Sequence, residues 1–249
     1  MTEGNSMTAT EQELAEFWDD FAEEYEEIQQ ESPFPIAQEL SDFLFQEKIF
    51  PCQTLLDVAG GSGRYLSSFQ EYVSEYTLAD ISPRMLEIAK TKQTQENVCF
   101  LQQSQEALMT SEKKFQVVFS AMNPALDSPE KIRDLCQLSQ EWCLIFRLIE
   151  EQDSLFSPYE QETNPQLNWM EDYKNFLKKE KQSFFSKQFS YEKIEEVSKS
   201  FFHDYFENQF TEQMLNKYIR NIFGSQETKE NQHKVVYELI YIPCGDKQL

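Results

Sequence analysis

The sequence of 249 residues predicts an α/β protein whose mostly parallel sheet is covered by helices on both faces. Short apolar segments alternate with segments in which apolar residues recur every three or four positions, the pattern of strands alternating with helices. The strand segments are apolar almost without interruption, which is typical of parallel strands buried on both sides. In such a sheet the crossovers are right-handed and a ligand binds beyond the carboxyl ends of the strands.

The first part of the chain predicts two helices. Over residues 11–30 six apolar side chains recur at helical spacing and form one stripe, which indicates an amphipathic helix: Leu14, Phe17, Trp18, Phe21, Tyr25 and Ile28. Pro33 and Pro35 interrupt this helix, and a second one is expected over 36–47. We expect residues 11–48 to form a helical cap on the domain.

Five strands follow in alternation with helices. The strands are expected at residues 54–59, 76–79, 98–101, 115–120 and 142–148, and the helices at 65–73, 82–92 and 129–140. Ser82 and Pro83 suit the start of the second of these helices, since serine caps a helix and proline is tolerated at its first position.

Beyond Glu150 the alternation stops. Residues 151–181 are polar and predicted to be helical or irregular, followed by a strand at 182–189, helices at 191–202 and 211–223, and a final strand at 234–242. Because no repeat or low-complexity linker divides the chain, we interpret residues 1–249 as a single domain, with 151–230 as a helical or irregular insertion.

Acidic residues outnumber basic ones by 44 to 22, which gives a formal net charge of −22 at pH 7. Such a surface repels polyanions, so we expect neither a nucleic-acid substrate nor a nucleic-acid partner. The five cysteines have no metal-ligand or redox spacing, and we interpret them as reduced, packed thiols. No apolar run approaches about 18 residues and the acidic start resembles no export signal, so we predict a cytoplasmic protein without membrane contact.

A glycine-rich turn follows the first strand, where three of the chain's six glycines, Gly60, Gly61 and Gly63, fall within four residues. Glycine allows positive φ and close approach of a ligand to the backbone. Asp80 ends the next strand, at the distance from the turn where an acid accepts hydrogen bonds from ribose hydroxyls. Leu66 occupies the third glycine position of a dinucleotide fingerprint, which disfavours NAD or FAD, and no lysine and serine or threonine of a phosphate loop follow.

The segments Leu55-Leu56-Asp57-Val58-Ala59-Gly60-Gly61-Ser62-Gly63-Arg64 and Ala79-Asp80-Ile81-Ser82-Pro83-Arg84-Met85-Leu86-Glu87-Ile88-Ala89 resemble the two cofactor motifs of class I S-adenosylmethionine-dependent methyltransferases, in order and at the proper spacing. This resemblance implies a Rossmann-like, doubly wound sheet of seven strands with an antiparallel last strand, and an insertion near the substrate pocket. It implies S-adenosylmethionine as cofactor and methyl transfer to a small-molecule acceptor.

The resemblance and the strand ends together assign twelve residues to cofactor binding: Tyr25, Asp57, Ala59, Gly60, Gly61, Gly63, Asp80, Ile81, Met85, Ser104, Gln105 and Ser120. Within this set Asp80 is expected to bind the ribose, and Ile81 and Met85 to flank the adenine. Ser104 departs from the family, which usually has an acid there to bind the adenine amino group. The serine hydroxyl or the Gln105 amide is able to accept that bond instead.

Catalytic residues are not identified by any motif. Asn123, in a loop after the fourth predicted strand, and His203, beside Asp204, are the candidates, and no metal site is predicted. Two alternatives remain open: a non-catalytic S-adenosylmethionine-binding sensor or assembly protein, and a nicotinamide-dependent oxidoreductase. The sequence is compatible with a monomer or a homodimer and does not identify the acceptor.

Overall fold

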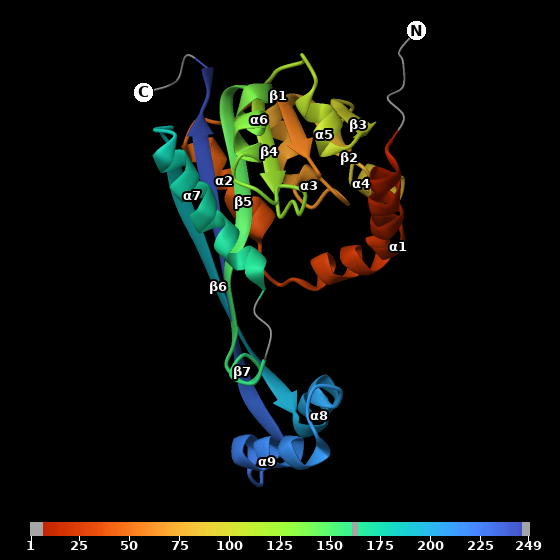
Figure 1. Cartoon of the computed structure of the whole chain (residues 1–249), viewed down its shortest axis with the longest axis vertical. Helices are drawn as coiled ribbons and strands as arrows, with labels where there is room; N and C mark the ends of the chain where they lie inside the picture. The colour runs from red at the N-terminus through yellow and green to blue at the C-terminus, as the bar shows by residue number, and fades with distance from the viewer. Residues whose placement is uncertain (1–6, 161–163, 246–249) are drawn as a thin grey trace. The chain divides into compact units, whose positions relative to one another are not determined.

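The computed structural model describes residues 7–160 and 164–245 and contains a seven-stranded sheet in the order β3-β2-β1-β4-β5-β7-β6 (Figure 1). The strands are β1 Cys52–Val58, β2 Val73–Asp80, β3 Val98–Gln102, β4 Phe115–Ala121, β5 Ser139–Asp153, β6 Phe185–Ser198 and β7 Thr228–Pro243. Strands β1 to β5 pair in parallel, and β7 runs antiparallel to both of its neighbours. The predicted fold class is therefore confirmed.

The register of the central strands brings their carboxyl ends to one level. Asp57 of β1 is opposite Leu78 of β2 on one side and Phe119 of β4 on the other. The residues that follow these three positions therefore meet at the same edge of the sheet, where ligands bind in open parallel sheets.

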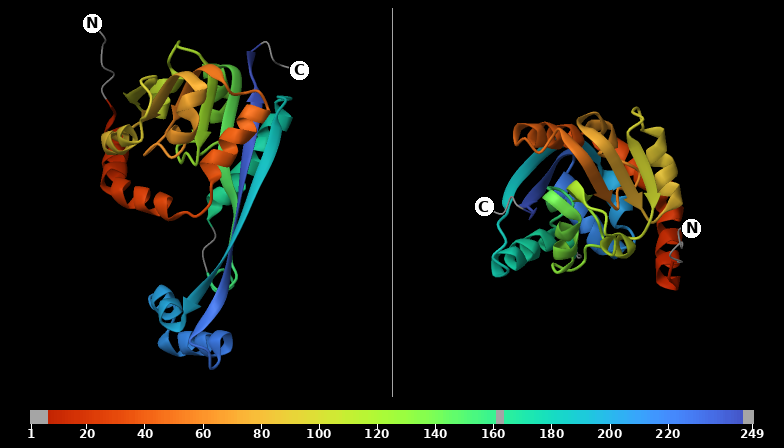
Figure 2. Two further views of the ribbon diagram at one scale, coloured as in Figure 1. Left: turned by 180° about the vertical axis from the view of Figure 1, so that it is seen from behind. Right: turned by 90° about the horizontal axis from the view of Figure 1, so that it is seen from above.

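Helices lie on both faces of the sheet (Figure 2). The described helices are α1 Ala9–Glu31, α2 Ile36–Gln46, α3 Leu66–Phe69, α4 Pro83–Thr91, α5 Gln105–Met109, α6 Lys131–Leu138, α7 Trp169–Lys179, α8 Lys199–Phe206 and α9 Glu212–Phe223, with short 3-10 turns at Gln70–Tyr72 and Pro165–Asn168. Helix α1 begins with a capping box, in which Thr8 and Glu11 each accept a hydrogen bond from the other's backbone amide. Among the described helices, none combines the length and the apolar composition needed to cross a membrane.

The described residues divide into two compact units. The first takes up residues up to Arg147, Trp169–Lys187 and the chain from Leu239 onward, and the second takes up Leu148–Asn168 and Gln188–Glu238. A cluster of buried aromatic residues around Phe202 and Phe206 forms the core of the second unit. The insertion expected over 151–230 overlaps this unit, and its position near a substrate pocket stays a prediction.

The helix predicted over 191–202 is wrong. Strand β6 continues to Ser198, and α8 begins only at Lys199, where the Ser198 hydroxyl accepts a hydrogen bond from the Phe201 amide. Burial at the alternating positions Phe189, Tyr191 and Val197 is the pattern of a strand. Other differences are ones of length, since the helix expected over 65–73 is a four-residue α3 with a 3-10 turn, β5 and β7 are longer than predicted, and α5 was not expected.

The apolar stripe of α1 does not supply the buried positions of this helix. The buried positions of this helix are Ala15, Ala22 and Glu26, which belong to the side that packs on α4, whereas Leu14 and Phe17 are exposed. Small side chains allow the two helices to approach closely, so the large aromatic residues point elsewhere.

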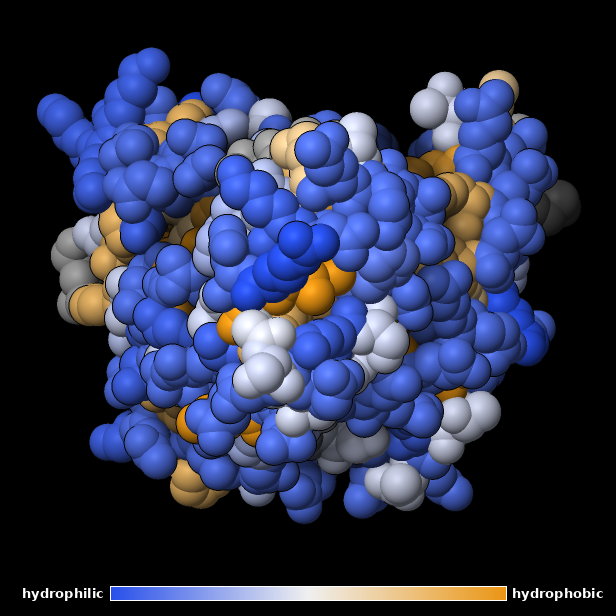
Figure 3. Space-filling model, turned by 90° about the horizontal axis from the view of Figure 1, so that it is seen from below, coloured by the Kyte–Doolittle hydropathy of each residue, from blue (hydrophilic) through white to orange (hydrophobic). Residues whose placement is uncertain are grey.

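Three of the five cysteines come together although they are far apart in the sequence. The Cys136 thiol of α6 interacts with the thiols of Cys143 in β5 and Cys244 after β7. All five cysteines are free thiols. On the face shown in Figure 3, hydrophilic side chains predominate and apolar ones appear only in small patches, in keeping with the acidic composition.

Candidate active site

The glycine-rich turn after β1 is held from the next strand. The Gly60 amide donates to the Ala79 carbonyl at 3.0 Å, and the Gly61 amide donates to Oδ2 of Asp80 at 2.8 Å. Ala59, Gly61 and Gly63 all have positive φ, of 55°, 55° and 77°. Positive φ is strained for alanine, and such strain is found at functional sites more often than elsewhere.

The three glycines of the turn differ in how much space surrounds them. A Cβ at Gly60 would lie 2.7 Å from Cγ of Leu78, and one at Gly63 would lie 3.1 Å from Cβ of Ala89, so these two positions are closed by packing. A Cβ at Gly61 would meet nothing nearer than Cε1 of Tyr25, at 3.8 Å. Gly61 is therefore the position where the backbone is open to a ligand.

Asp57 is a buried acid beneath the turn. Its Oδ2 accepts a hydrogen bond from the Tyr76 hydroxyl at 2.8 Å. Burial raises the pKa of Asp57 to about 7, the Tyr76 hydrogen bond opposes this rise, and the nearby charge of Asp80 adds to it. A cationic group brought beside this carboxyl would favour its charged form.

Asp80 uses both carboxylate oxygens to organise the site. Oδ1 accepts from the Ser82 amide at 2.9 Å and Oδ2 from the Gly61 amide. Burial raises the pKa of Asp80, and its backbone hydrogen bonds partly offset this shift. A carboxylate oxygen has the capacity for two hydrogen bonds, so Asp80 is able to accept a further one, from a ribose hydroxyl.

A cavity opens beside the turn, and it is lined by eight of the predicted cofactor residues: Tyr25, Ala59, Gly61, Asp80, Ile81, Met85, Ser104 and Gln105. A smaller adjoining cavity is lined by Asp57 and Gly60 and shares Tyr25, Ala59, Gly61, Ala121 and Met122 with the first. Gly63 and Ser120 line neither of these cavities, but the Ser120 hydroxyl accepts a hydrogen bond from Asn123, which does line the first.

Asn123 lines the cavity, and its side chain holds the loop after β4. Its Nδ2 donates to Oε1 of Gln105 at 2.6 Å and to Oγ of Ser120 at 3.0 Å, while Oδ1 accepts from the Ala125 amide at 2.9 Å. These contacts bring together three predicted residues from separate segments. The geometry of Asn123 is that of a residue that positions the loop.

Ser104 caps α5 by accepting a hydrogen bond from the Ala107 amide at 3.2 Å. The same hydroxyl forms a hydrogen bond with the carboxylate of Glu11, and this bond is the largest cause of the lowered pKa of Glu11. The first turn of α1 thus places an acid next to the serine that departs from the family pattern.

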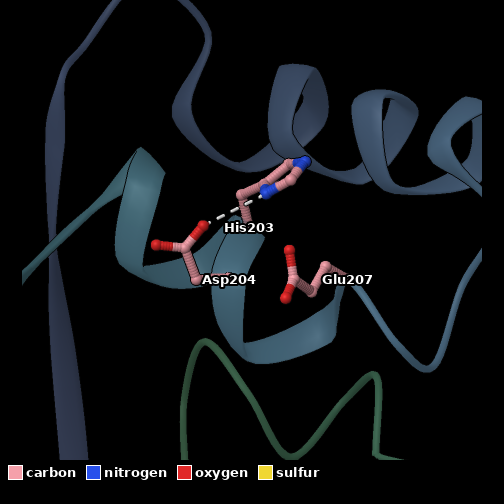
Figure 4. Close-up of side chains that lie close together, drawn as sticks. All are labelled: His203, Asp204 and Glu207. Carbon is pink, nitrogen blue, oxygen red and sulfur yellow. Dashed lines mark hydrogen bonds and ion pairs between the residues drawn. The ribbon is translucent and has the colours of Figure 1, made fainter.

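His203, the other catalytic candidate, belongs to a different unit from the residues that line this cavity. It lies on α8 in the second unit, with Nδ1 at 3.3 Å from Asp204 and Nε2 at 3.4 Å from Glu212. These carboxylates raise its pKa, with the Asp204 hydrogen bond as the largest cause. His203, Asp204 and Glu207 offer ligand atoms within 4.8 Å of one another (Figure 4), although exposed groups of this kind are common without a metal ion.

Several lining residues were missed by sequence reasoning. They are Leu14, Trp18, Gln103, Glu106, Ala121 at the end of β4 and Met122 after it, whereas Pro124 and Ala125 belong to the loop that was expected at the mouth of the pocket. Trp18 carried a signal, since it lies on the same predicted stripe as Tyr25. Met122 has a φ of 51°, which no sequence pattern revealed.

Residues 55–140 match the family model described as a methyltransferase domain. This part of the chain, which holds both cofactor motifs, is similar to a methyltransferase domain. No curated protein sequence matches the chain closely enough to indicate a relative.

Solved structures support the fold of this chain. One is magnesium protoporphyrin IX methyltransferase from Synechocystis with bound S-adenosylmethionine, with a TM-score of 0.52 and 12% identity, covering 95% of this chain and 99% of that chain. Another is precorrin 8w decarboxylase from Methanobacterium thermoautotrophicum, with a TM-score of 0.52 and 10% identity, covering 84% of this chain and 92% of that chain. At such low identity these likenesses concern the fold, while the methyltransferase domain implies S-adenosylmethionine as cofactor.

Proposed function

We propose that this methyltransferase transfers the methyl group of S-adenosylmethionine to a small-molecule acceptor in the cavity beside Gly61. The observation that carries this proposal is the convergence of residues from the turn after β1, the end of β2, α4, α5 and α1 on that one cavity.

The residues present fit the cofactor. We assign the open backbone at Gly61 to the methionine and ribose portions, Asp80 to the ribose hydroxyls, and Ile81 with Met85 to the adenine faces. Asp57, whose carboxyl is buried beneath the turn, is suited to balance the positive charge of the amino end. These roles extend the resemblance of the motifs to the geometry of this chain.

The chemistry asks little of acid–base groups. The sulfonium of the cofactor supplies an activated methyl group, so the protein contributes chiefly alignment of the acceptor atom, worth about 7–11 kcal/mol in well-oriented systems. Neither of the chain's two histidines lines the cavity, and Asp80 and Glu106 are the acids on its wall. The Asn123 side chain contributes by fixing the loop that faces the cofactor.

Charge argues for a small acceptor. With a net charge of −22 the protein repels nucleic acids, and we propose that it acts without a nucleic-acid partner. The free cysteines agree with a reducing compartment, and we propose the cytoplasm.

The test has two steps. Calorimetry measures the affinity for S-adenosylmethionine and S-adenosylhomocysteine, and transfer of a radiolabelled methyl group is then followed in a cell extract separated into small molecules, proteins and nucleic acids. Label in the small-molecule fraction supports the proposal. Label only in a macromolecular fraction, or binding without transfer to any fraction, contradicts it.

A further inference from the structure

Helix α1 has two faces of opposite character. One face packs on α4 through Ala15 and Ala22 and through polar contacts: Asp19 accepts hydrogen bonds from the Ser82 hydroxyl and the Arg84 amide, and Glu26 forms an ion pair with Lys92 at 2.7 Å. These contacts use small and polar residues, whereas Leu14 and Phe17 lie on another side of the helix and are exposed.

Four rings follow one another along the second face, which we call the aromatic face: Phe17, Trp18, Phe21 and Tyr25. Ring centroids of Phe17 and Trp18 are 5.3 Å apart, and those of Phe21 and Tyr25 are 6.0 Å apart. Such contacts fix the rings relative to one another. Phe17 is nevertheless 58% exposed, and Leu14, one turn earlier, is 40% exposed.

The aromatic face begins inside the cofactor cavity and continues beyond it. Leu14, Trp18 and Tyr25 line the cavity, whereas Phe17 and Phe21 do not. An apolar surface that runs outward from a binding cavity is positioned to hold the part of a ligand that extends from the reacting atom. Contiguous exposed apolar side chains of this kind usually mark a binding surface.

The charge of the helix restricts what binds there. Residues 9–31 contain ten acidic side chains and no basic one. An anionic group lying along this helix would be repelled, whereas a neutral group is tolerated and a cation is attracted to the rings and to the acids.

We infer that the methyl acceptor is an apolar small molecule without negative charge, which lies on the aromatic face of α1 with its reacting atom directed into the cavity. This inference rests on the proposed function and specifies its substrate class. A molecule on the aromatic face is able to reach the cavity, because Trp18 lines the cavity and its ring contacts Phe17 on the face.

The uncharged dye N-phenyl-1-naphthylamine is the probe, added to the protein saturated with S-adenosylhomocysteine. We compare the wild type with Phe17→Ser and with the matched control Phe45→Ser, since Phe45 on α2 is 53% exposed and does not line the cavity. Loss of an apolar ring contact predicts a dye affinity about 5- to 20-fold lower in Phe17→Ser and unchanged in Phe45→Ser. The related dye 1-anilinonaphthalene-8-sulfonate, which carries a negative charge, is expected to bind more weakly than the neutral dye.

Three results would overturn the inference: equal dye affinity in the two variants, equal or tighter binding of the anionic dye, or a dimer in sedimentation that Phe17→Ser dissociates. The neutral dye is also expected to inhibit methyl transfer in the extract assay, and no inhibition would count against the inference. Calorimetry with S-adenosylhomocysteine separates the two proposals, because its failure in the wild type rejects the proposed function, while the dye comparison judges the aromatic face alone. Circular dichroism of both variants checks that they are folded.

Discussion

Asp80 accepts a hydrogen bond from the backbone amide of Gly61 at 2.8 Å, so the acid that ends β2 holds the turn that follows β1. The same carboxylate accepts from the Ser82 amide and thereby also fixes the start of α4. One side chain thus sets the positions of three segments that line the cavity. This arrangement makes Asp80 important both for the cofactor and for the shape of its site.

We predict that Asp80→Ala weakens cofactor affinity by about 10- to 200-fold, because ribose hydroxyls lose a charged partner worth about 1.5–3 kcal/mol. Asp80→Asn keeps the shape and one acceptor oxygen, so its loss should be smaller. Calorimetry with S-adenosylhomocysteine measures both. Unchanged affinity in Asp80→Ala would remove this residue from the cofactor site.

The buried Asp57 predicts a particular dependence of stability on pH. Its pKa is about 7 in the folded protein and 3.8 ordinarily, so the folded state binds more protons between these values. The free energy of unfolding should therefore decrease as pH rises from about 4 to about 7, by at most about 1.4 kcal/mol per pH unit from this group, and show no further change from it above that range.

Asp57→Asn tests this directly, since an amide oxygen still accepts the Tyr76 hydrogen bond but does not titrate. Denaturant unfolding at several pH values should give a flatter profile in the variant, and greater stability relative to the wild type at pH 8 than at pH 4. Parallel profiles for the two proteins would show that folding does not change the pKa of Asp57.

We predict that Gly61→Ala weakens cofactor binding without preventing folding. A Cβ there would point into open space near Tyr25, so Gly61→Ala should fold but occupy the cofactor's path and lower its affinity by about tenfold or more. Gly224→Ala is the control, because Gly224 also has positive φ, with no atom within 4 Å of an added Cβ, and lies outside the cavity. If calorimetry gives equal losses in both variants, Gly61 does not contact the cofactor.

The thiols should differ in reactivity. Burial raises the pKa of Cys52 to about 12, and neighbouring thiols with burial raise the pKa values of Cys136 and Cys244. Since the thiolate is the reactive form, a disulfide reagent at pH 8 should modify the exposed Cys99 first and the others only after unfolding. Cys99→Ser should abolish the fast phase, and a fast phase that persists would contradict this assignment.

Much of the parallel sheet was predictable because its strands are apolar runs that periodicity detects. The region around Tyr191 was not, since Tyr191, Ile194 and Val197 fit helical spacing as well as the alternation of Phe189, Tyr191 and Val197 fits a strand. Pairing in the sheet decides such cases, and local sequence does not contain it. Likewise, the stripe of α1 was identified, but periodicity does not reveal what covers an apolar face.

The candidate site was predictable where a motif is contiguous. Asp57, Gly61 and Asp80 line the cavities as the motifs indicated. Met122 and Glu106 were not found because they reach the wall through loop geometry and a short helix rather than through a pattern. The thiols of Cys136 and Cys244 meet only because the last strand returns beside β5.

Trp18 and Tyr25 belong at once to the cavity wall and to a helix attached to α4 mainly by polar groups. Linkage between binding and docking is reciprocal, so a ligand that touches these rings strengthens the attachment of α1 by as much as the attached helix strengthens the ligand. The many glutamates of α1 then become reporters, because a glutamate-specific protease will digest the helix more slowly when the cavity is filled.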